Sequence, residues 1–292
     1  MKELLRKLRK YEIQIRKAIT TQMQGDFHSV FKGSGLEYED VRAYQYGDDV
    51  RSIDWNVSAK GHGTFIKTYK EEKEQSVFLI LDVSASQEIG LPDQQKLDIG
   101  REITGILALA AVKQQSQVGV ICFSDVKELY LPADKGITRA YNIIKSIYNL
   151  KPKSIRTSLA NGLKLVLSIL KRKTIIILIS DFIDQNYQRE LKTLAKRHDL
   201  VVIQLYDKRD QSLPKLGIVP LYDKEAQKVV WVNTSSDDFK NSYEGNYAGN
   251  RKELEQLCRK YNANYLAVDT SEDYVPQLVA LFNIRKKYKR SA

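Results

Sequence analysis

The chain has 292 residues and a mass of 33.6 kDa, which is enough for one large α/β domain with an appendage and a well-buried core. Its 42% hydrophobic and 28% charged residues, with a mean hydropathy of −0.41, are typical of a soluble globular protein and exclude collagen-like and disordered classes. The longest apolar runs, at 106–112 and 175–179, are far shorter than the roughly 20 residues that a membrane-spanning helix needs.

The net charge of +11 is concentrated at the two ends of the chain. The first 24 residues carry seven Lys or Arg residues against two Glu residues, and the tail adds five more basic residues between 285 and 290. The part in between is close to neutral, so no basic groove through the whole protein is indicated. Basic ends of this kind contact an acidic partner, a membrane surface or nucleic acid, or they are solvated surface.

Five apolar residues near the start repeat at helical spacing: Leu4, Leu8, Tyr11, Ile15 and Ile19. The spacing predicts an amphipathic basic helix within residues 1–24 that docks on an apolar surface. The stretch lacks the unbroken apolar segment and cleavage site of a secretory signal, so we expect a cytoplasmic protein, with the inner face of the membrane as an alternative reached through the basic ends. Cys122 and Cys258 have no metal-like spacing and are predicted to be small core residues.

The composition and the hydrophobic pattern of the sequence change after residue 75. Residues 25–75 are rich in Gly, Asp, Tyr and Arg, whereas from residue 76 onward apolar strand-like runs alternate with helical stripes, the pattern of a mostly parallel sheet built from βαβ units. We predict strands at 64–69, 77–82, 117–123, 127–131, 174–180, 199–206 and 264–269, helices around 99–110, 159–170 and 275–282, and a hairpin at 216–233 that is an insertion or a sheet edge. The predicted fold class is α/β, with an N-terminal helix at 1–24, a small segment at 25–75, a sheet domain at 76–285 and a basic tail at 286–292.

Three oxygen-bearing side chains follow the first strand of this sheet: Asp82, Ser84 and Ser86. They come at the C-terminal end of a buried parallel strand, which is where open α/β sheets bind ligands. Carboxylate and hydroxyl groups that alternate in a tight turn aim hard oxygen donors at one point, and such donors suit Mg²⁺. Taken alone, the same turn also suits a helix cap or a set of satisfied loop amides.

Two further residues arrive in the order that a five-residue oxygen site needs. Thr157 opens a predicted helix, and Asp181 follows the second very apolar strand, 174–180, at its C-terminal end. Each has a structural alternative, since Thr157 suits a helix N-cap and Asp181 suits a loop-capping acid. The separations along the chain leave room for strands and helices that bring adjacent strand ends together. A site shared by all five residues is therefore the favoured interpretation.

This constellation resembles the metal-ion-dependent adhesion site (MIDAS) of the von Willebrand factor A-type domain, which is written D-x-S-x-S, then a Thr, then an Asp. The resemblance covers residues 76–285 and implies a Rossmann-like domain with a mostly parallel central sheet flanked by helices. It also implies that Asp82, Ser84, Ser86, Thr157 and Asp181 hold a divalent cation, Mg²⁺ in the first place and Mn²⁺ or Ca²⁺ as alternatives. One coordination position would then stay open for an acidic residue of a partner protein.

The preceding segment narrows the family further. Residues 33–55 read GSGLEYEDVRAYQYGDDVRSIDW and are followed by Ser58-Ala59-Lys60 and by Glu74. They resemble the pattern G-x-G-x-E-F, R-x-Y-x-x-G-D-x-x-R-x-I-D-W of the bacterial family called domain of unknown function 58. That resemblance implies a partnership with a MoxR-type AAA+ ATPase, in which the chain is an adaptor for the chaperone-like assembly or maturation of client proteins.

The sequence departs from these patterns at three positions. Tyr38 stands where Phe is usual, Gln87 stands where many adhesion sites have Met, and Arg156 directly precedes Thr157. An Arg156 side chain that points inward would weaken Mg²⁺ binding through repulsion of like charges.

The charged residues of the 33–55 segment have two interpretations. In one, they form a second functional surface together with Trp55; in the other, they pair internally. The charged residues are Arg42, Arg51, Asp48, Asp49 and Asp54. In the structural interpretation Gly47-Asp48 makes a turn and Trp55 anchors the segment on the main domain.

No enzymatic activity is expected. A Mg²⁺-dependent phosphohydrolase with Asp82 as its nucleophile would want a second acid two residues on, where Ser84 stands. The sequence also lacks the phosphate-loop, dinucleotide-binding, zinc-protease and nucleophile-elbow motifs. Binding of nucleic acid or of a membrane surface through the basic ends is the third alternative, and the near-neutral body argues against nucleic acid.

Overall fold

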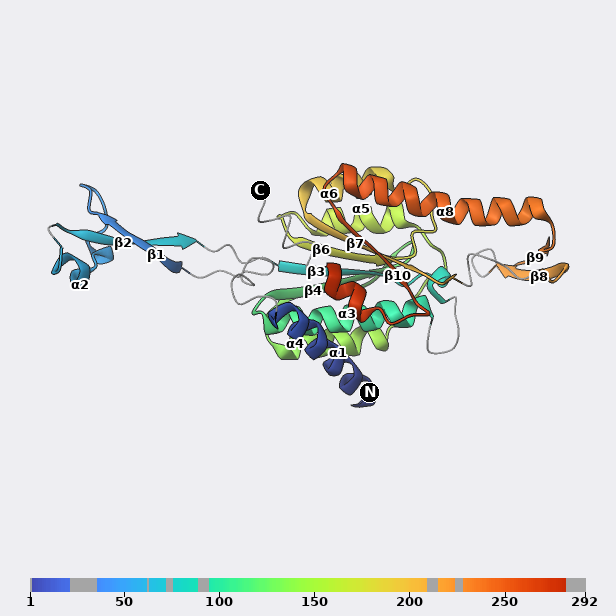
Figure 1. Ribbon diagram of the computed structural model, residues 1–292, viewed down its shortest axis with the longest axis horizontal. Helices are drawn as coiled ribbons and strands as arrows, with labels where there is room; N and C mark the ends of the chain where they lie inside the picture. The colour runs from blue at the N-terminus through green and yellow to red at the C-terminus, as the bar shows by residue number, and fades with distance from the viewer. Residues whose placement is uncertain are drawn as a thin grey trace.

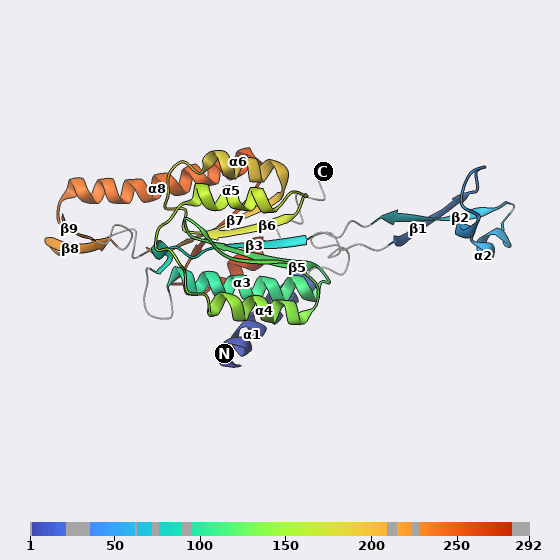
Figure 2. The ribbon, with the colours of Figure 1, turned by 180° about the vertical axis from the view of Figure 1, so that it is seen from behind.

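A six-stranded sheet with helices on both faces forms the body of the protein (Figure 1, Figure 2). The computed structural model describes residues 2–21, 36–61, 63–71, 76–88, 95–208, 215–223 and 228–281. The prediction of an α/β fold with a mostly parallel central sheet is therefore confirmed. Among these residues, no helix has the length and apolar character required to cross a membrane.

The sheet has the strand order β10-β7-β6-β3-β4-β5. Its strands are β3 (Ser76–Asp82), β4 (Gln117–Phe123), β5 (Lys127–Asp134), β6 (Ile175–Ser180), β7 (Asp199–Tyr206) and β10 (Asn264–Asp269). All neighbouring pairs are parallel except β4 and β5, which are antiparallel. The chain passes from β3 to β4 on one side and later returns to β6 on the other side, so the topological switch point lies between β3 and β6.

Helices cover the two faces of the sheet in separate layers (Figure 1). On one face lie α1 (Lys2–Thr21), α3 (Lys96–Lys113), α4 (Ile137–Tyr148) and a helix at 275–281. On the other face lie α5 (Leu159–Ile169), α6 (Gln188–Arg197) and α8 (Asp237–Lys260). A parallel sheet needs this double cover because both of its faces are apolar.

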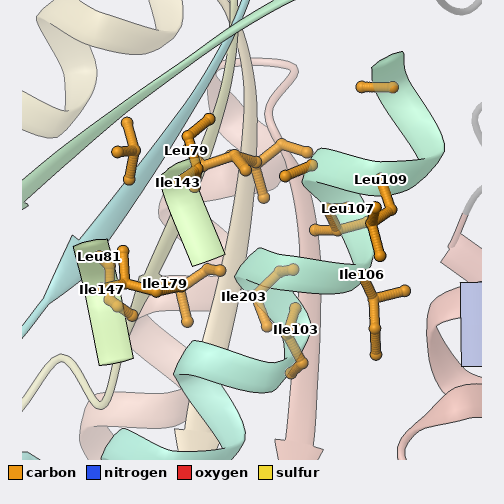
Figure 3. Close-up of a cluster of buried hydrophobic side chains, with 14 of the residues drawn as sticks. Leu79, Leu81, Ile103, Ile106, Leu107, Leu109, Ile143, Ile147, Ile179 and Ile203 are labelled. Carbon is orange, nitrogen blue, oxygen red and sulfur yellow. The ribbon is translucent and has the colours of Figure 1, made fainter. Parts of the chain in front are cut away.

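Strand β3 supplies side chains to both halves of the core. Leu79 and Leu81 belong to the cluster on the α3 face, shown in Figure 3, whereas Phe78 and Ile80 belong to the cluster on the α5 face. This alternation follows from the period of two along a strand. The predicted burial of Cys122 and Cys258 is also confirmed, since both thiols are buried and unbridged.

The first helix docks on the body as its spacing predicts. Leu8 is fully buried against the α3 cluster, and Leu4 and Tyr11 pack beside it. Ion pairs tie the helix down, since Lys113 Nζ donates to Glu12 Oε2 at 2.7 Å. The side chains of Ile15 and Ile19 lie outside those that the structure describes.

A small module stands at one end of the molecule (Figure 1). It consists of the antiparallel pair β1 (Leu36–Ala43) and β2 (Phe65–Glu71), with two short helices, η2 (Val50–Ser52) and α2 (Trp55–Ser58), between them. The predicted strand at 64–69 is present as β2, while β1 was not predicted. The expectation that Trp55 anchors this segment on the main domain is wrong, because its side chain is 68% exposed.

Internal pairing explains most charged residues of the module. The Arg42 guanidinium donates to both oxygens of Asp48 at 2.8 and 2.7 Å, and Gly47 before it has a φ of 106° that makes the turn. Asp49 accepts from the backbone N–H of Arg51, and Asp54 accepts from two backbone N–H groups of α2. Positions 33–35 and Glu74 of the family pattern lie outside the described residues.

The predicted hairpin at 216–233 is present as an insertion rather than a sheet edge. Its strands, β8 (Ile218–Asp223) and β9 (Lys228–Asn233), pair antiparallel in a two-stranded sheet of their own. The hairpin follows β7 and lies at the end of the molecule opposite the β1–β2 module (Figure 1).

Gly162 in α5 is required for close packing against β4. A Cβ atom at this position would lie 2.1 Å from Cδ2 of Phe123, whose side chain is fully buried at the end of β4. We therefore expect Gly162→Ala to lower the free energy of unfolding by about 1–3 kcal/mol through overpacking, measured by urea denaturation.

Gly249 in α8 offers the matched control, because a Cβ there meets nothing within 4 Å. Gly249→Ala is expected to raise the free energy of unfolding by about 0.5–1 kcal/mol through helix propensity alone. Equal effects of the two substitutions would contradict the packing argument.

Candidate metal centre

The candidate site lies at the C-terminal ends of two neighbouring parallel strands. β3 ends at Asp82 and β6 ends at Ser180, directly before Asp181. After β3 the chain turns through Ser84 into the short helix η3 (Ala85–Glu88), which carries Ser86. Since this edge is also the topological switch point, it is where an open α/β sheet leaves room for a ligand.

Asp82 is buried and is held by hydroxyl and amide donors. Its Oδ1 accepts from the backbone N–H of Ser84 at 3.0 Å and from Ser84 Oγ at 2.6 Å. Its Oδ2 accepts from Ser180 Oγ at 2.8 Å and from Gln87 Nε2 at 3.4 Å. The residue that replaces the usual Met, Gln87, thus contributes a donor to the central carboxylate.

The charge of Asp82 is energetically costly in this position. Burial, and next the nearby charge of Asp181, raise the pKa of Asp82 to about 7, although the hydrogen bonds from Ser84 and Ser180 act in the opposite direction. Two carboxylates that share a buried edge repel each other unless a cation lies close by. The electrostatics of this edge therefore favour a positive charge.

The hydroxyl groups of the motif form a continuous chain with Asp82. Ser84 Oγ lies 3.1 Å from Ser86 Oγ, and Thr157 Oγ1 donates to Ser86 Oγ at 3.5 Å. Thr157 comes from a segment 75 positions further along the sequence, so the fold brings it to the β3 turn. Thr157 is not the helix N-cap, because Ser158 fills that role by accepting from the N–H of Asn161 at 3.3 Å.

Glu128 fixes the segment that carries Thr157. Its carboxylate accepts from the backbone N–H groups of Lys153 at 2.8 Å and Ser154 at 3.1 Å, and from Ser124 Oγ at 2.7 Å. Because Glu128 lies on β5, it joins this segment to the edge strand of the sheet.

Two further contacts tie the Thr157 segment to the other parts of the site. The carbonyl of Ile155 accepts from the N–H of Ala85 at 3.2 Å. Asp184, three residues after Asp181, accepts from the N–H of Leu159 at 2.6 Å. Hydrogen bonds from backbone N–H groups therefore connect the Thr157 segment to the turn after β3 and to the loop after β6.

Asp181 faces a buried lysine. Its Oδ2 lies 3.6 Å from Nζ of Lys96 and accepts no hydrogen bond, and both side chains are 1% exposed. Its Oδ1 accepts from the N–H of Ile183 at 3.2 Å, across Phe182, which adopts a φ of 57°. The cation next to the site is therefore Lys96, whereas the side chain of Arg156 is exposed.

The donor set fits a hard divalent cation. It combines the carboxylates of Asp82 and Asp181 with the hydroxyls of Ser84, Ser86 and Thr157, and the Asp181 Oδ2 atom without a hydrogen bond is buried beside them. Oxygen ligands of this kind suit Mg²⁺. In the described ranges, no group of three or more His, Cys, Asp or Glu residues is placed to hold a metal ion, so this donor set depends on its hydroxyl groups as well as its two carboxylates.

Sequence reasoning missed the residues that support the motif. Lys96, Glu128 and Ser180 each contact the site or its segments from another element, and none belongs to the D-x-S-x-S pattern. Ser180 carried one local signal, since a serine stands next to an acid at the end of a fully apolar strand. Lys96 and Glu128 carried none, because only the fold brings them near the motif.

Comparison with known proteins places the chain in a family. Residues 40–253 match the family described as "Protein of unknown function DUF58". The chain belongs to this family. The uncharacterized protein Rv1480 of Mycobacterium tuberculosis is 26% identical to it over 286 residues, which cover 96% of this chain and 89% of that protein.

Solved structures with similar folds include two that cover most of this DUF58 chain. The conserved hypothetical protein BatB of Bacteroides thetaiotaomicron is 14% identical, with a TM-score of 0.44, and the match covers 74% of this chain and 99% of BatB. The SpRpn10 VWA domain is 11% identical, with a TM-score of 0.36, over 72% of this chain and 94% of that domain. Likenesses at this level carry no function to the DUF58 chain.

Removal of the Glu128 carboxylate is expected to loosen the Thr157 segment. In Glu128→Ala the N–H groups of Lys153 and Ser154 lose their acceptor, so their amide hydrogens should exchange at least about tenfold faster, since a hydrogen bond to a charged group contributes about 1.5–3 kcal/mol.

Asp134→Ala is the control, since Asp134 also lies on β5 and accepts only from the N–H of the next residue in its exposed position. It should leave the exchange of both amides unchanged. Unchanged exchange in Glu128→Ala would show that other contacts hold the segment.

Proposed function

We propose that this DUF58 protein is a metal-dependent protein-binding adaptor and not an enzyme. The observation that carries the proposal is the linked oxygen set of Asp82, Ser84, Ser86 and Thr157, with Asp181 beside it, at the switch-point edge. When bound, Mg²⁺ would supply an open coordination position for a carboxylate of a partner protein. Mn²⁺ and Ca²⁺ are the alternative ions.

The residues divide into holding and supporting roles. The hydroxyls of Ser84, Ser86 and Thr157 and the carboxylates of Asp82 and Asp181 would hold the ion, directly or through water. Ser180, Gln87 and Glu128 would keep these groups in place, because each donates to or anchors a part of the motif.

The proposed partners are a MoxR-type AAA+ ATPase and a client protein that supplies the acidic residue. Membership of the DUF58 family and the resemblance of the 33–55 segment to its pattern support this assignment. ATP hydrolysis would belong to the ATPase, and the DUF58 chain would present the client during chaperone-like assembly or maturation.

The environment of Asp82 argues against the phosphohydrolase alternative. A carboxylate nucleophile must reach the substrate, whereas Asp82 is 1% exposed and both of its oxygens accept hydrogen bonds. Ser84, where a second acid would be needed, donates its hydroxyl to Asp82.

An exposed apolar surface accompanies the site at the same edge of the molecule. The β8–β9 hairpin follows the C-terminal end of β7, which runs parallel to β3 and β6. On one face of the hairpin the cross-strand pairs place Pro220 opposite Trp231 and Tyr222 opposite Val229. All four side chains are exposed, and Trp231 is 68% exposed. Such a patch is typical of a surface that contacts another protein.

Replacement of Asp82 by Asn is expected to abolish Mg²⁺ binding. The amide keeps the shape of the side chain but removes the charge, so affinity in calorimetry should fall by about 100-fold or more. At pH 8, without divalent ions, Asp82→Asn should be no less stable than the wild type: the folded-state pKa of about 7 lies above the ordinary 3.8, so the ionised carboxylate costs stability above that pH.

Asp134→Asn is the control for loss of a charge. Asp134 pairs with Val118 near the start of β4, whereas the site lies at the ends of β3 and β6, so this substitution should leave Mg²⁺ binding unchanged. The metal-dependent function fails if the wild type binds neither Mg²⁺ nor Mn²⁺, or if Asp82→Asn binds as tightly as the wild type.

The hairpin surface is tested by Trp231→Ser. If the apolar face contacts the ATPase, this substitution should reduce capture of a MoxR-type ATPase from the same genome by about tenfold or more, measured by surface plasmon resonance. Val230→Ser, on the opposite face of the same strand, should change capture by less than about threefold. Equal losses in both variants would argue against a face-specific contact.

A further inference from the structure

Lys96 is a buried lysine at the metal edge. It is among the largest fully buried side chains of the protein, and it is the first residue of α3. Its ammonium lies 3.6 Å from Asp181 Oδ2, an atom that accepts no hydrogen bond. A fully buried lysine is rare unless it is paired with an acid, because removal of the ammonium group from water is costly.

The position of Lys96 in its helix does not explain this burial. The N-terminus of a helix carries a partial positive charge and favours acidic residues, so a lysine at the first position opposes the helix dipole. Gln95, which precedes it, makes no side-chain cap hydrogen bond. The ion pair with Asp181 thus stabilises the ammonium in a place that the helix dipole disfavours.

We propose that Lys96 is a resident counter-ion of the metal site. Without a divalent ion, its ammonium compensates the buried carboxylate of Asp181, which neighbours Asp82, so the edge keeps its shape. With the ion in place, Lys96 repels it and lowers the affinity of the site. This inference rests on the proposed function, since it concerns the same site.

The charges also indicate which ligand completes the site. Two carboxylates and one ammonium leave one negative charge at the edge, and a divalent ion changes this to one positive charge. That excess is compensated by one carboxylate from a partner. Lys96 would therefore make the ion bind more tightly once the partner's acid is in place.

The test is calorimetric titration of Mg²⁺ into the wild type, Lys96→Met, Lys96→Gln and Lys113→Met. Both Lys96 variants are expected to bind Mg²⁺ at least about tenfold more tightly than the wild type, because a like charge is removed next to the ion. Without Mg²⁺ they should melt at a lower temperature, and saturating Mg²⁺ should restore more of their stability than it does for the wild type. Lys96→Gln keeps a polar group in case Lys96→Met does not fold.

Lys113→Met is the matched control, because it breaks an ion pair with buried Glu12 at the other end of the same helix. It should melt at a lower temperature without any change in Mg²⁺ affinity. Equal or weaker Mg²⁺ binding by both Lys96 variants, with the wild type binding, would overturn the counter-ion role and leave the proposed function intact.

Two further outcomes separate the proposals. If the Lys96 variants bind Mg²⁺ and the wild type does not, the counter-ion role is supported and metal dependence of the native protein fails. If folded variants and wild type all fail to bind, both proposals are overturned.

Discussion

The burial of Asp82 at the end of the central strand is the constraint on which the site depends. β3 is covered on both faces, with Leu79 and Leu81 on one side and Phe78 and Ile80 on the other, so its last residue is drawn into the protein. A carboxylate in that position needs donors and a positive charge nearby. The hydroxyls of Ser84 and Ser180 and the amide of Gln87 donate to it. The ammonium of Lys96 pairs with the neighbouring Asp181. These groups come from three elements, η3, β6 and α3, and from the loop after β3.

Much of the fold could be predicted because its strands are buried on both faces. The runs at 117–123, 199–206 and 264–269 agree with the structure to the residue, since continuous apolar stretches of this length leave few alternatives. The sequence also singled out the five residues of the motif, and the structure links Asp82, Ser84, Ser86 and Thr157 by hydrogen bonds, with Asp181 beside them. That they hold a metal ion stays a prediction. β1 was missed, since two successive acids, Glu39 and Asp40, interrupt its alternation where the register shifts. The exposure of Trp55 was missed because its segment belongs to a small module of its own, the β1–β2 module, and does not pack on the main sheet.

The supporting residues could not be predicted because their roles depend on distance in space and not in sequence. Glu128 accepts a hydrogen bond from the N–H of Lys153, which lies 25 positions later in the chain. No pattern in either segment predicts this contact. Lys96 begins an apolar helix, where a lysine is ordinarily a solvated end residue. A local sequence motif shows which oxygen-bearing side chains are present. Tertiary contacts determine which hydrogen bonds and charges surround these side chains.

The two ends of the molecule have different chemistry. The edge that carries the candidate metal site combines hard oxygen donors with the apolar hairpin, whereas the β1–β2 module lies at the other end (Figure 2). This module exposes Tyr46 and Trp55, and its Arg42 pairs with Asp48. β3 follows the module in the sequence and ends at the candidate metal site. Under the proposed function, a partner bound at the candidate metal site would leave the β1–β2 module free for a second contact.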